Sequence, residues 1–198
     1  RSYLTEPAFK FNITREEAFA PAAQFVQATF QTRDSSSGKW VNLQLLQDLL
    51  KNHLKDADPA VLIDADLKRL RFVYNNALQL PKDSLYIGAL DALSGKYEKH
   101  PSASEILYEK ALTIYQKGHL YSDQDSEKLQ WVYRDAYDLC QQIIKQYPDA
   151  FGAKQAALLA TSIQQKNLNL NVEEVNLPNE PFLAQISYQN VHKAYLKV

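Results

Sequence analysis

The chain has 198 residues, of which 45% are hydrophobic and 23% are charged, a composition typical of a globular protein. Its formal net charge of −1 gives no electrostatic reason to expect nucleic acid or an anionic membrane surface as a partner. No apolar run approaches the ~20 residues of a membrane helix, so we expect no membrane contact. The single cysteine, Cys140, excludes an internal disulfide and a cysteine-rich metal site.

The N-terminal region predicts one helix after an irregular start. Thr14-Arg15-Glu16-Glu17 has the spacing of a capping box, in which the threonine side chain accepts from the backbone of the residue three positions later. A helix is therefore expected from there to about Phe30, with a start or a break at Pro21. Residues 32–38 form a loop by composition.

Four apolar stripes at helical spacing predict four helices in the middle of the chain. Asp58 and Pro59 are expected as N-cap and first residue of the second of these helices, and Pro81 opens the third. Ser102 with Glu105 predicts a capping box for the fourth, which ends at Gly118 as a C-cap residue. The stripes are Leu43, Leu46, Leu49, Leu50 and Leu54; Leu62, Leu67, Leu70, Val73, Tyr74 and Ala77; Leu85, Ala89, Leu90, Leu93 and Tyr97; and Ile106, Leu107, Ala111, Ile114 and Tyr115.

Two further helices complete the helical region. Asp123 or Ser126 is expected to cap a long helix that ends at Tyr147-Pro148, and Asp149 or Gly152 starts the last one. Their apolar positions are Leu129, Val132, Tyr133, Ala136, Leu139, Cys140, Ile143 and Ile144, then the mostly small Ala153, Ala156, Ala157, Ala160 and Ile163. About seven helices without intervening strands predict a mainly α fold of stacked antiparallel helix pairs.

In the C-terminal residues, the spacing of apolar residues changes from a helical period to alternation. After a polar stretch with two prolines, alternating apolar residues predict two strands, each with one buried face. These residues are Phe182, Ala184, Ile186 and Tyr188, then Ala194, Leu196 and Val198. Two strands alone form no stable sheet, and the chain has no methionine. We therefore expect a fragment: a helical domain at 1–170, and at 171–198 a linker with the first strands of a β domain that continues further.

A blurred repeat accompanies the helices. Ala111, Ala136 and Pro148 match the small-residue and proline positions of a tetratricopeptide repeat, and residues 84–118 form a second, degenerate unit. The segment from Gly118 to Arg134 is longer than the usual tight turn, and Ile143 stands where a small residue is preferred. A tetratricopeptide-like solenoid and a plain helical bundle both stay open.

The residues whose side chains could take part in catalysis or metal binding are better explained by structural roles. The histidines lie in four separate segments, without a metal-ligand partner at suitable spacing; they are His53, His100, His119 and His192. The acidic residues near helix starts suit the helix dipole and can pair with basic residues one turn later; these are Asp56, Asp58, Asp64 and Asp66 with Lys68, Arg69 and Arg71. We predict no catalytic residue, no metal site and no cofactor.

The remaining motifs are weak. Residues 123–127 loosely resemble a calcium loop but lack its glycine and terminal glutamate, so an N-cap cluster is expected. Asn12-Ile-Thr14 fits a glycosylation acceptor, although Thr14 already has a capping role. Cys140 is expected to be a buried hydrophobe and not a nucleophile. The twelve tyrosines and two tryptophans either fill the space between helices, which we favour, or form a concave protein-binding surface.

Several segments resemble a known family. Residues 66–73, 82–87 and 140–148, followed by Phe151-Gly-Ala-Lys, are similar to the helical N-terminal region of large alpha-2-macroglobulin-family proteins of Bacteroidetes. Residues 175–182 and 186–198 resemble the opening strands of the first macroglobulin β-sandwich. The resemblance covers most of the chain from about Leu43, through diffuse motifs that are not catalytic.

The resemblance implies a protein exported to the periplasm or cell surface, often lipid-anchored through a segment absent here. The whole protein would act as a protease trap, an endopeptidase inhibitor with a bait region. Some members form a thioester from Cys-x-Glu-Gln, whereas Cys140 is followed by Gln-Gln-Ile. This chain would then be a non-catalytic scaffold or protein-interaction region that positions the macroglobulin domains or binds a protease or envelope partner. Two alternatives are a free-standing tetratricopeptide-type adaptor and an all-helical hydrolase or lyase with a deep carboxylate-containing pocket.

Overall fold

The computed structural model describes residues 9–119, 131–173 and 182–195, and within these ranges the chain is mainly helical. The helices are η1 (Glu16–Phe19, 3-10), α1 (Ala22–Phe25), α2 (Gly38–His53), α3 (Ala60–Asn76), α4 (Lys82–Lys96), α5 (Ala103–Gly118), α6 (Val132–Gln146) and α7 (Phe151–Gln164). The strands are β1 (Asn167–Val172) and β2 (Ala184–Gln189). The predicted fold class, mainly α with short C-terminal strands, is confirmed.

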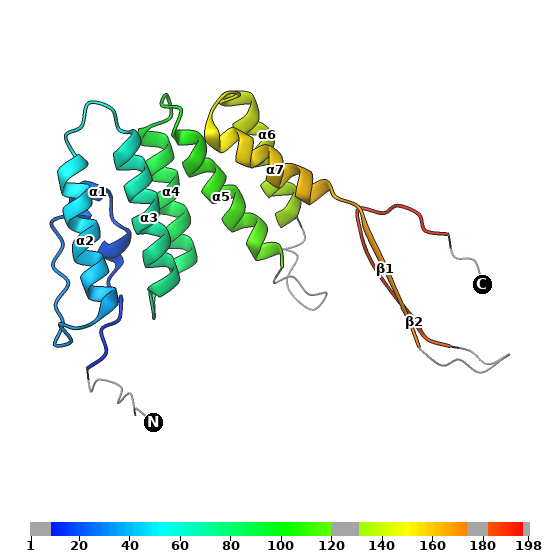
Figure 1. The fold of residues 1–198 in the computed structure, drawn as a ribbon, viewed down its shortest axis with the longest axis horizontal. Helices are drawn as coiled ribbons and strands as arrows, with labels where there is room; N and C mark the ends of the chain where they lie inside the picture. Colours follow the sequence, from blue (N-terminus) through cyan, green and yellow to red (C-terminus); the bar gives the residue numbers. More distant parts are fainter. Residues whose placement is uncertain (1–8, 120–130, 174–181, 196–198) are drawn as a thin grey trace.

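The helices follow one another in space in the order of the sequence. Figure 1 shows α2, α3, α4 and α5 side by side in a row, followed by α6 and α7. Helix α5 packs against α4 on one side and against both α6 and α7 on the other. Strands β1 and β2 leave the end of α7 and extend away from the helices. The result is a stack of helices with a two-stranded ribbon at one end.

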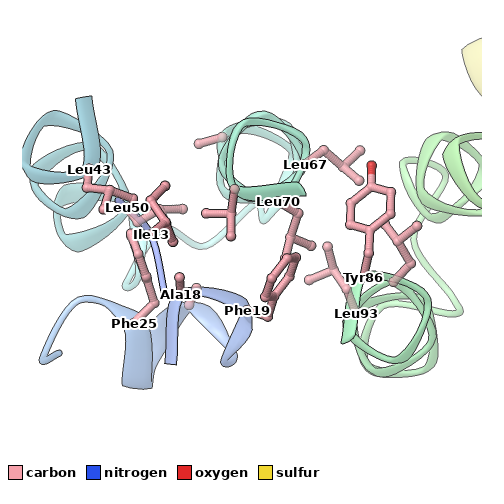
Figure 2. Packing of buried hydrophobic residues seen from close by; sticks show 14 of the residues in the cluster. Ile13, Ala18, Phe19, Phe25, Leu43, Leu50, Leu67, Leu70, Tyr86 and Leu93 are labelled. Atoms are coloured by element: carbon pink, nitrogen blue, oxygen red, sulfur yellow. The ribbon is translucent and has the colours of Figure 1, made fainter. Parts of the chain in front are cut away.

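A first hydrophobic cluster joins the N-terminal segment to α2, α3 and α4. Figure 2 shows Phe25 pointing from α1 towards Ile13 and Leu50, while Phe19 points from η1 towards Leu70 and α4. Phe25, Leu50 and Ile13 are all buried. Burying such a side chain contributes about 1.5–3 kcal/mol, so these contacts hold the irregular N-terminal segment against the helices.

A second cluster between α5, α6 and α7 consists largely of small residues. Ala111, Ala136 and Ala156 are fully buried. A Cβ built on Gly152 would lie 2.3 Å from the carbonyl carbon of Ser104, so α7 and α5 approach each other backbone to backbone. The mostly small residues expected on the apolar face of α7 allow this close packing.

The helix expected from Thr14 to about Phe30 is wrong. Helix η1 has only four residues and its N-cap, Arg15, makes no capping hydrogen bond. The side chain of Glu17 pairs with the Arg15 guanidinium instead of reaching back to the backbone. Ala20 is extended, with ψ 158°, as expected for a residue before proline, and α1 then spans one turn. The expected break at Pro21 is confirmed.

Two predicted helix starts differ from the structure in their caps. Pro59 and not Asp58 is the N-cap of α3, which begins at Ala60, so this start is one residue later than predicted. Asp58 Oδ1 still accepts from the Ala60 backbone N–H at 2.9 Å. The Ser102 capping box is wrong, because Ser102 has helical φ and ψ and its side chain caps nothing. Its backbone N–H instead donates to His100 Nδ1 at 3.2 Å. The His100 side chain therefore stabilises the turn between α4 and α5.

The C-terminus of α5 and the N-terminus of α7 also differ from what the sequence predicted. Gly118 is the last residue of α5, but no described glycine has a positive φ. A Cβ at Gly118 would instead lie 2.6 Å from the ring of Tyr133, so the tyrosine side chain packs against the glycine and would have to shift to admit a larger residue. Helix α7 begins at Phe151 with Ala150 as N-cap and no capping side chain, so it starts between the two expected positions, Asp149 and Gly152.

Two further predictions concern α6 and α2. Helix α6 ends at Gln146, before Tyr147-Pro148, as expected. It begins at Val132 with Trp131 as N-cap, so the expected start after Asp123 or Ser126, which lie outside the described residues, is wrong. In α2, Leu49 is 40% exposed although it was expected in the buried stripe. Gln47 is buried instead, and its Nε2 donates to the carbonyls of Phe25 and Ala28, both at 2.7 Å.

Candidate functional site

The β-ribbon, Asn167–Val172 paired with Ala184–Gln189, has two chemically different faces. The strands are antiparallel, and directly opposed residues lie on the same face of a sheet. One face carries the pairs Leu168 and Tyr188, Leu170 and Ile186, Val172 and Ala184. The other face carries Asn167 and Gln189, Asn169 and Ser187, Asn171 and Gln185. The ribbon is therefore apolar on one side and covered with amides and a hydroxyl on the other.

No part of the chain that the structure describes covers the apolar face of the β-ribbon. Every residue of both strands is exposed, with Leu168 at 48%, Leu170 at 50% and Tyr188 at 70%. Neither strand contains a charged residue or a proline, the usual devices that keep open strand edges from pairing with other chains. A two-stranded sheet is at best marginally stable in water. This face is thus the strongest candidate for a protein-interaction surface.

The structure changes the predicted strand pairing. The strand expected around Phe182–Tyr188 is confirmed as β2, but its partner β1 lies in the polar stretch that was taken for a connection. Residues 193–195 are not in a strand, and Leu196 and Val198 lie outside the described residues. The expected buried face is wrong, since both faces are exposed. The predicted division between residues 170 and 171 falls inside β1.

Asn190 attaches the β-ribbon to the helices. Directly after β2, it adopts a positive φ of 53°, a conformation that asparagine tolerates better than most residues. Its Nδ2 donates to the carbonyl oxygens of Ile163 at 2.6 Å and Gln165 at 3.1 Å. These carbonyls at the end of α7 would otherwise lack a partner within the helix. One side chain thus closes α7 and fixes the base of the ribbon.

The acidic and basic residues of α3 serve the fold. Asp66 and Arg69 form a buried ion pair, with Arg69 Nε donating to Asp66 Oδ1 at 2.7 Å. Arg69 Nη1 also donates to the carbonyl of Ala18 at 2.6 Å, and the guanidinium stacks 4.7 Å from the centroid of the Phe25 ring. The prediction that aspartates pair with basic residues one helical turn later is confirmed for Asp66 with Arg69. It is also confirmed, at the surface, for Asp64 with Lys68.

A second polar network joins α3, α4 and α5. Arg71 donates to both carboxylate oxygens of the buried Glu109, with its Nε at 3.1 Å from Oε1. The Tyr86 hydroxyl donates to Glu109 Oε1 at 2.7 Å, and its ring stacks on Tyr74 with centroids 4.5 Å apart. Burial raises the pKa of Tyr86, and the Glu109 carboxylate raises it further, so this hydroxyl remains a donor. Sequence patterns pointed to none of this network.

The histidines have surface partners that spacing did not predict. His53 Nδ1 lies 2.7 Å from Asp56 Oδ2, and His100 Nε2 lies 3.2 Å from Asp58 Oδ1. His119 Nδ1 lies 3.2 Å from a tyrosine hydroxyl. Within the described ranges, no group of three His, Cys, Asp or Glu side chains could hold a metal ion. The segment 123–127 lies outside these ranges.

The remaining candidates are also structural. Cys140 is fully buried in α6, and this burial raises the pKa of its thiol to about 11. The described tyrosines of the helices pack against the two hydrophobic clusters, which confirms the filler interpretation for them. The strongly exposed tyrosines among the described residues are Tyr188 and Tyr195, at 70% and 82%, and both lie in or after β2.

Comparison with known proteins gives no relative. No family model matches the chain, and searches of curated proteins and of solved structures found no match either. In the part of the chain that the structure describes, no helix combines the length and apolar character needed to cross a membrane. The function therefore has to be argued from the β-ribbon and its helical support.

Proposed function

We propose that this chain is a non-catalytic helical scaffold whose β-ribbon packs its apolar face onto a further β-sheet. The single observation that carries the proposal is the uncovered, uncharged apolar face made by residues such as Leu170 and Ile186. Leu168, Leu170 and Val172 retain between 43% and 50% of their exposure. Full burial of such a side chain contributes about 1.5–3 kcal/mol, so covering three half-exposed ones is expected to contribute roughly 3 kcal/mol.

The proposal extends to the resemblance with alpha-2-macroglobulin-family proteins. In that setting the ribbon supplies the first strands of a macroglobulin β-sandwich, and the stacked helices position it. The partners are then the macroglobulin domains of the same polypeptide, with a protease or an envelope protein as further partners. The whole protein acts at the periplasm or cell surface as an endopeptidase inhibitor. The support is the order of elements: stacked helices come first, and an exposed β-ribbon follows them. Asn190, directly after β2, anchors the ribbon to the end of α7.

Most candidate polar groups already have a structural partner, which supports a non-catalytic role. Asp66 and Arg69 tie the N-terminal segment to α3, and Glu109 joins α3, α4 and α5. The histidine–carboxylate pairs lie at the surface, where Asp58 is 76% exposed. An all-helical hydrolase would need such a pair in a water-excluding pocket.

Two matched double variants test the proposal. Leu170→Asn with Ile186→Asn changes a cross-strand pair on the apolar face, and Asn169→Ala with Ser187→Ala changes the neighbouring pair on the polar face. In the 198-residue chain both should leave the melting temperature unchanged, because neither face is buried. In the longer polypeptide that the proposal requires, only the apolar-face variant should destabilise the β domain. Equal effects of the two variants there would contradict the proposal.

A free-standing tetratricopeptide-type adaptor is the second candidate. The successive antiparallel pairs α4 with α5 and α6 with α7 favour it. In that case the ribbon is dispensable, and removing residues 167–198 leaves binding to a protein segment intact. Loss of binding on this truncation would count against the adaptor.

A further inference from the structure

A groove lies where the helices meet the β-ribbon. It is a shallow, open groove with a volume of about 520 Å³, more typical of a contact surface than of an enclosed small-molecule site. Its walls come from α6, from the end of α7 and from the residues after β2; the lining residues are Tyr133, Arg134, Tyr137, Ile163, Gln164, Lys166, Asn190 and His192. Figure 1 shows α7 leading directly into β1 at this place. We call this site the junction groove.

The junction groove is basic although the chain as a whole is not. Arg134 and Lys166 line it, and none of the described residues that form its walls is acidic. The formal net charge of the whole chain is −1 with histidine counted as neutral, so the groove is more basic than the chain average. A concave site with cations of one sign concentrates anionic partners. The charge of the groove therefore selects for negative ligands.

The end of α7 gives a competing explanation for these cations, which its geometry does not support. The carboxyl end of a helix carries about half a negative charge and favours nearby cations. Here the Asn190 amide already bonds the terminal carbonyls of Ile163 and Gln165. Arg134 belongs to α6 and stacks on Trp131, its Cζ 4.6 Å from the ring centroid, so it is held beside the groove by a different contact.

The other lining groups suit a peptide better than a small anion. Tyr133 and Tyr137 supply aromatic walls with hydroxyl groups, and the largely buried Ile163, 9% exposed, lies beneath them. The Tyr137 hydroxyl accepts from Gln164 Nε2 at 2.8 Å, which fixes both side chains. Aromatic, arginine and amide groups around a small apolar centre are typical of surfaces that bind protein segments.

We propose that the junction groove binds an acidic peptide segment. Its carboxylates would pair with Arg134 and Lys166, and an apolar or aromatic side chain between them would rest on Tyr137. This site is separate from the apolar face of the β-ribbon and does not depend on how that face is covered.

The test uses the full chain and two fluorescein-labelled peptides, Glu-Asp-Phe-Asp-Glu and Lys-Lys-Phe-Lys-Lys, in fluorescence anisotropy. The acidic peptide should bind at least about tenfold more tightly than the basic one, and increasing salt should weaken it because the charges are exposed. The double variant Arg134→Gln with Lys166→Gln should weaken the acidic peptide by about tenfold, the loss expected for two partly exposed ion pairs. Equal binding of both peptides would overturn the proposal.

A matched control removes the same charge elsewhere. Arg33 stacks on Phe9 as Arg134 stacks on Trp131, so Arg33→Gln with Lys39→Gln should change the affinity less than twofold. An equal loss in this control would show non-specific attraction and overturn the site. The emission of Trp131 reports location: the unlabelled acidic peptide should change tryptophan emission in the wild type and not in Trp131→Phe. A change that persists in Trp131→Phe would place binding elsewhere.

Discussion

Replacing Gly152 by alanine should destabilise the chain by about 2 kcal/mol. A Cβ at this position would lie 2.3 Å from the Ser104 carbonyl carbon, 2.4 Å from its oxygen and 2.5 Å from the Glu105 nitrogen. Carbon atoms prefer separations of about 3.5 Å, so α5 and α7 would have to part by roughly 1 Å. Overpacking costs about 1–3 kcal/mol, and contacts with backbone place it at the upper end. The higher helix propensity of alanine returns less than about 1 kcal/mol.

Thermal melting followed by circular dichroism measures this effect against a matched glycine. For a domain of this size, ~1 kcal/mol shifts the melting temperature by about 2–4 °C, so Gly152→Ala should melt about 4–8 °C lower. Gly88 lies in α4 with no atom within 4 Å of a built Cβ, and Gly88→Ala should therefore melt slightly higher than the wild type. If Gly152→Ala melts at or above the wild type, the close contact of α5 and α7 is wrong.

Three further variants or reagents test buried groups. Asp66→Asn leaves the Arg69 guanidinium buried without its anion and should cost about 3–5 kcal/mol in urea unfolding; a loss below ~1 kcal/mol would mean that the pair is solvated. Tyr86→Phe removes one hydrogen bond to Glu109 and should cost about 1 kcal/mol by the same assay, whereas no loss would discount that bond. The Cys140 thiol should resist a disulfide reagent in the folded chain and react after unfolding. Burial raises the pKa of the folded thiol to about 11. The stability that the buried, neutral thiol contributes is therefore fully present below the pKa of the unfolded thiol. It is lost as the pH rises towards 11; a rapid reaction in the folded chain would contradict the burial.

The helices α3 to α7 were predictable because their signals are local. The stripe that contains Leu67, Leu70 and Val73 repeats at helical spacing, and these residues are buried. Pro81 and Pro148 mark helix boundaries through a restriction of their own backbone. Cap details were less predictable, since the turn before α5 uses the His100 side chain and α7 begins without a capping side chain.

The main errors concern features decided by distant contacts. Asn167–Val172 alternates amide and apolar residues, which is already a strand pattern, but its polar composition favoured a linker. Only pairing with β2, far along the chain, decides between them. Arg69 stands four residues before the buried Val73, so helical spacing places it on the buried face, but a charged residue is rarely expected there. The carbonyl of Ala18, 51 residues away, gives the buried Arg69 a partner.

Amide hydrogen exchange of the β-ribbon tests the central claim most directly. The measurement compares β1 and β2 in the 198-residue chain and in the longer polypeptide that the proposal requires. A two-stranded ribbon without a covered face should exchange rapidly in the chain alone, because such a sheet opens easily. The account predicts strong protection of both strands in the longer polypeptide. Equally rapid exchange in both would contradict a scaffold whose ribbon is covered by a further β-sheet.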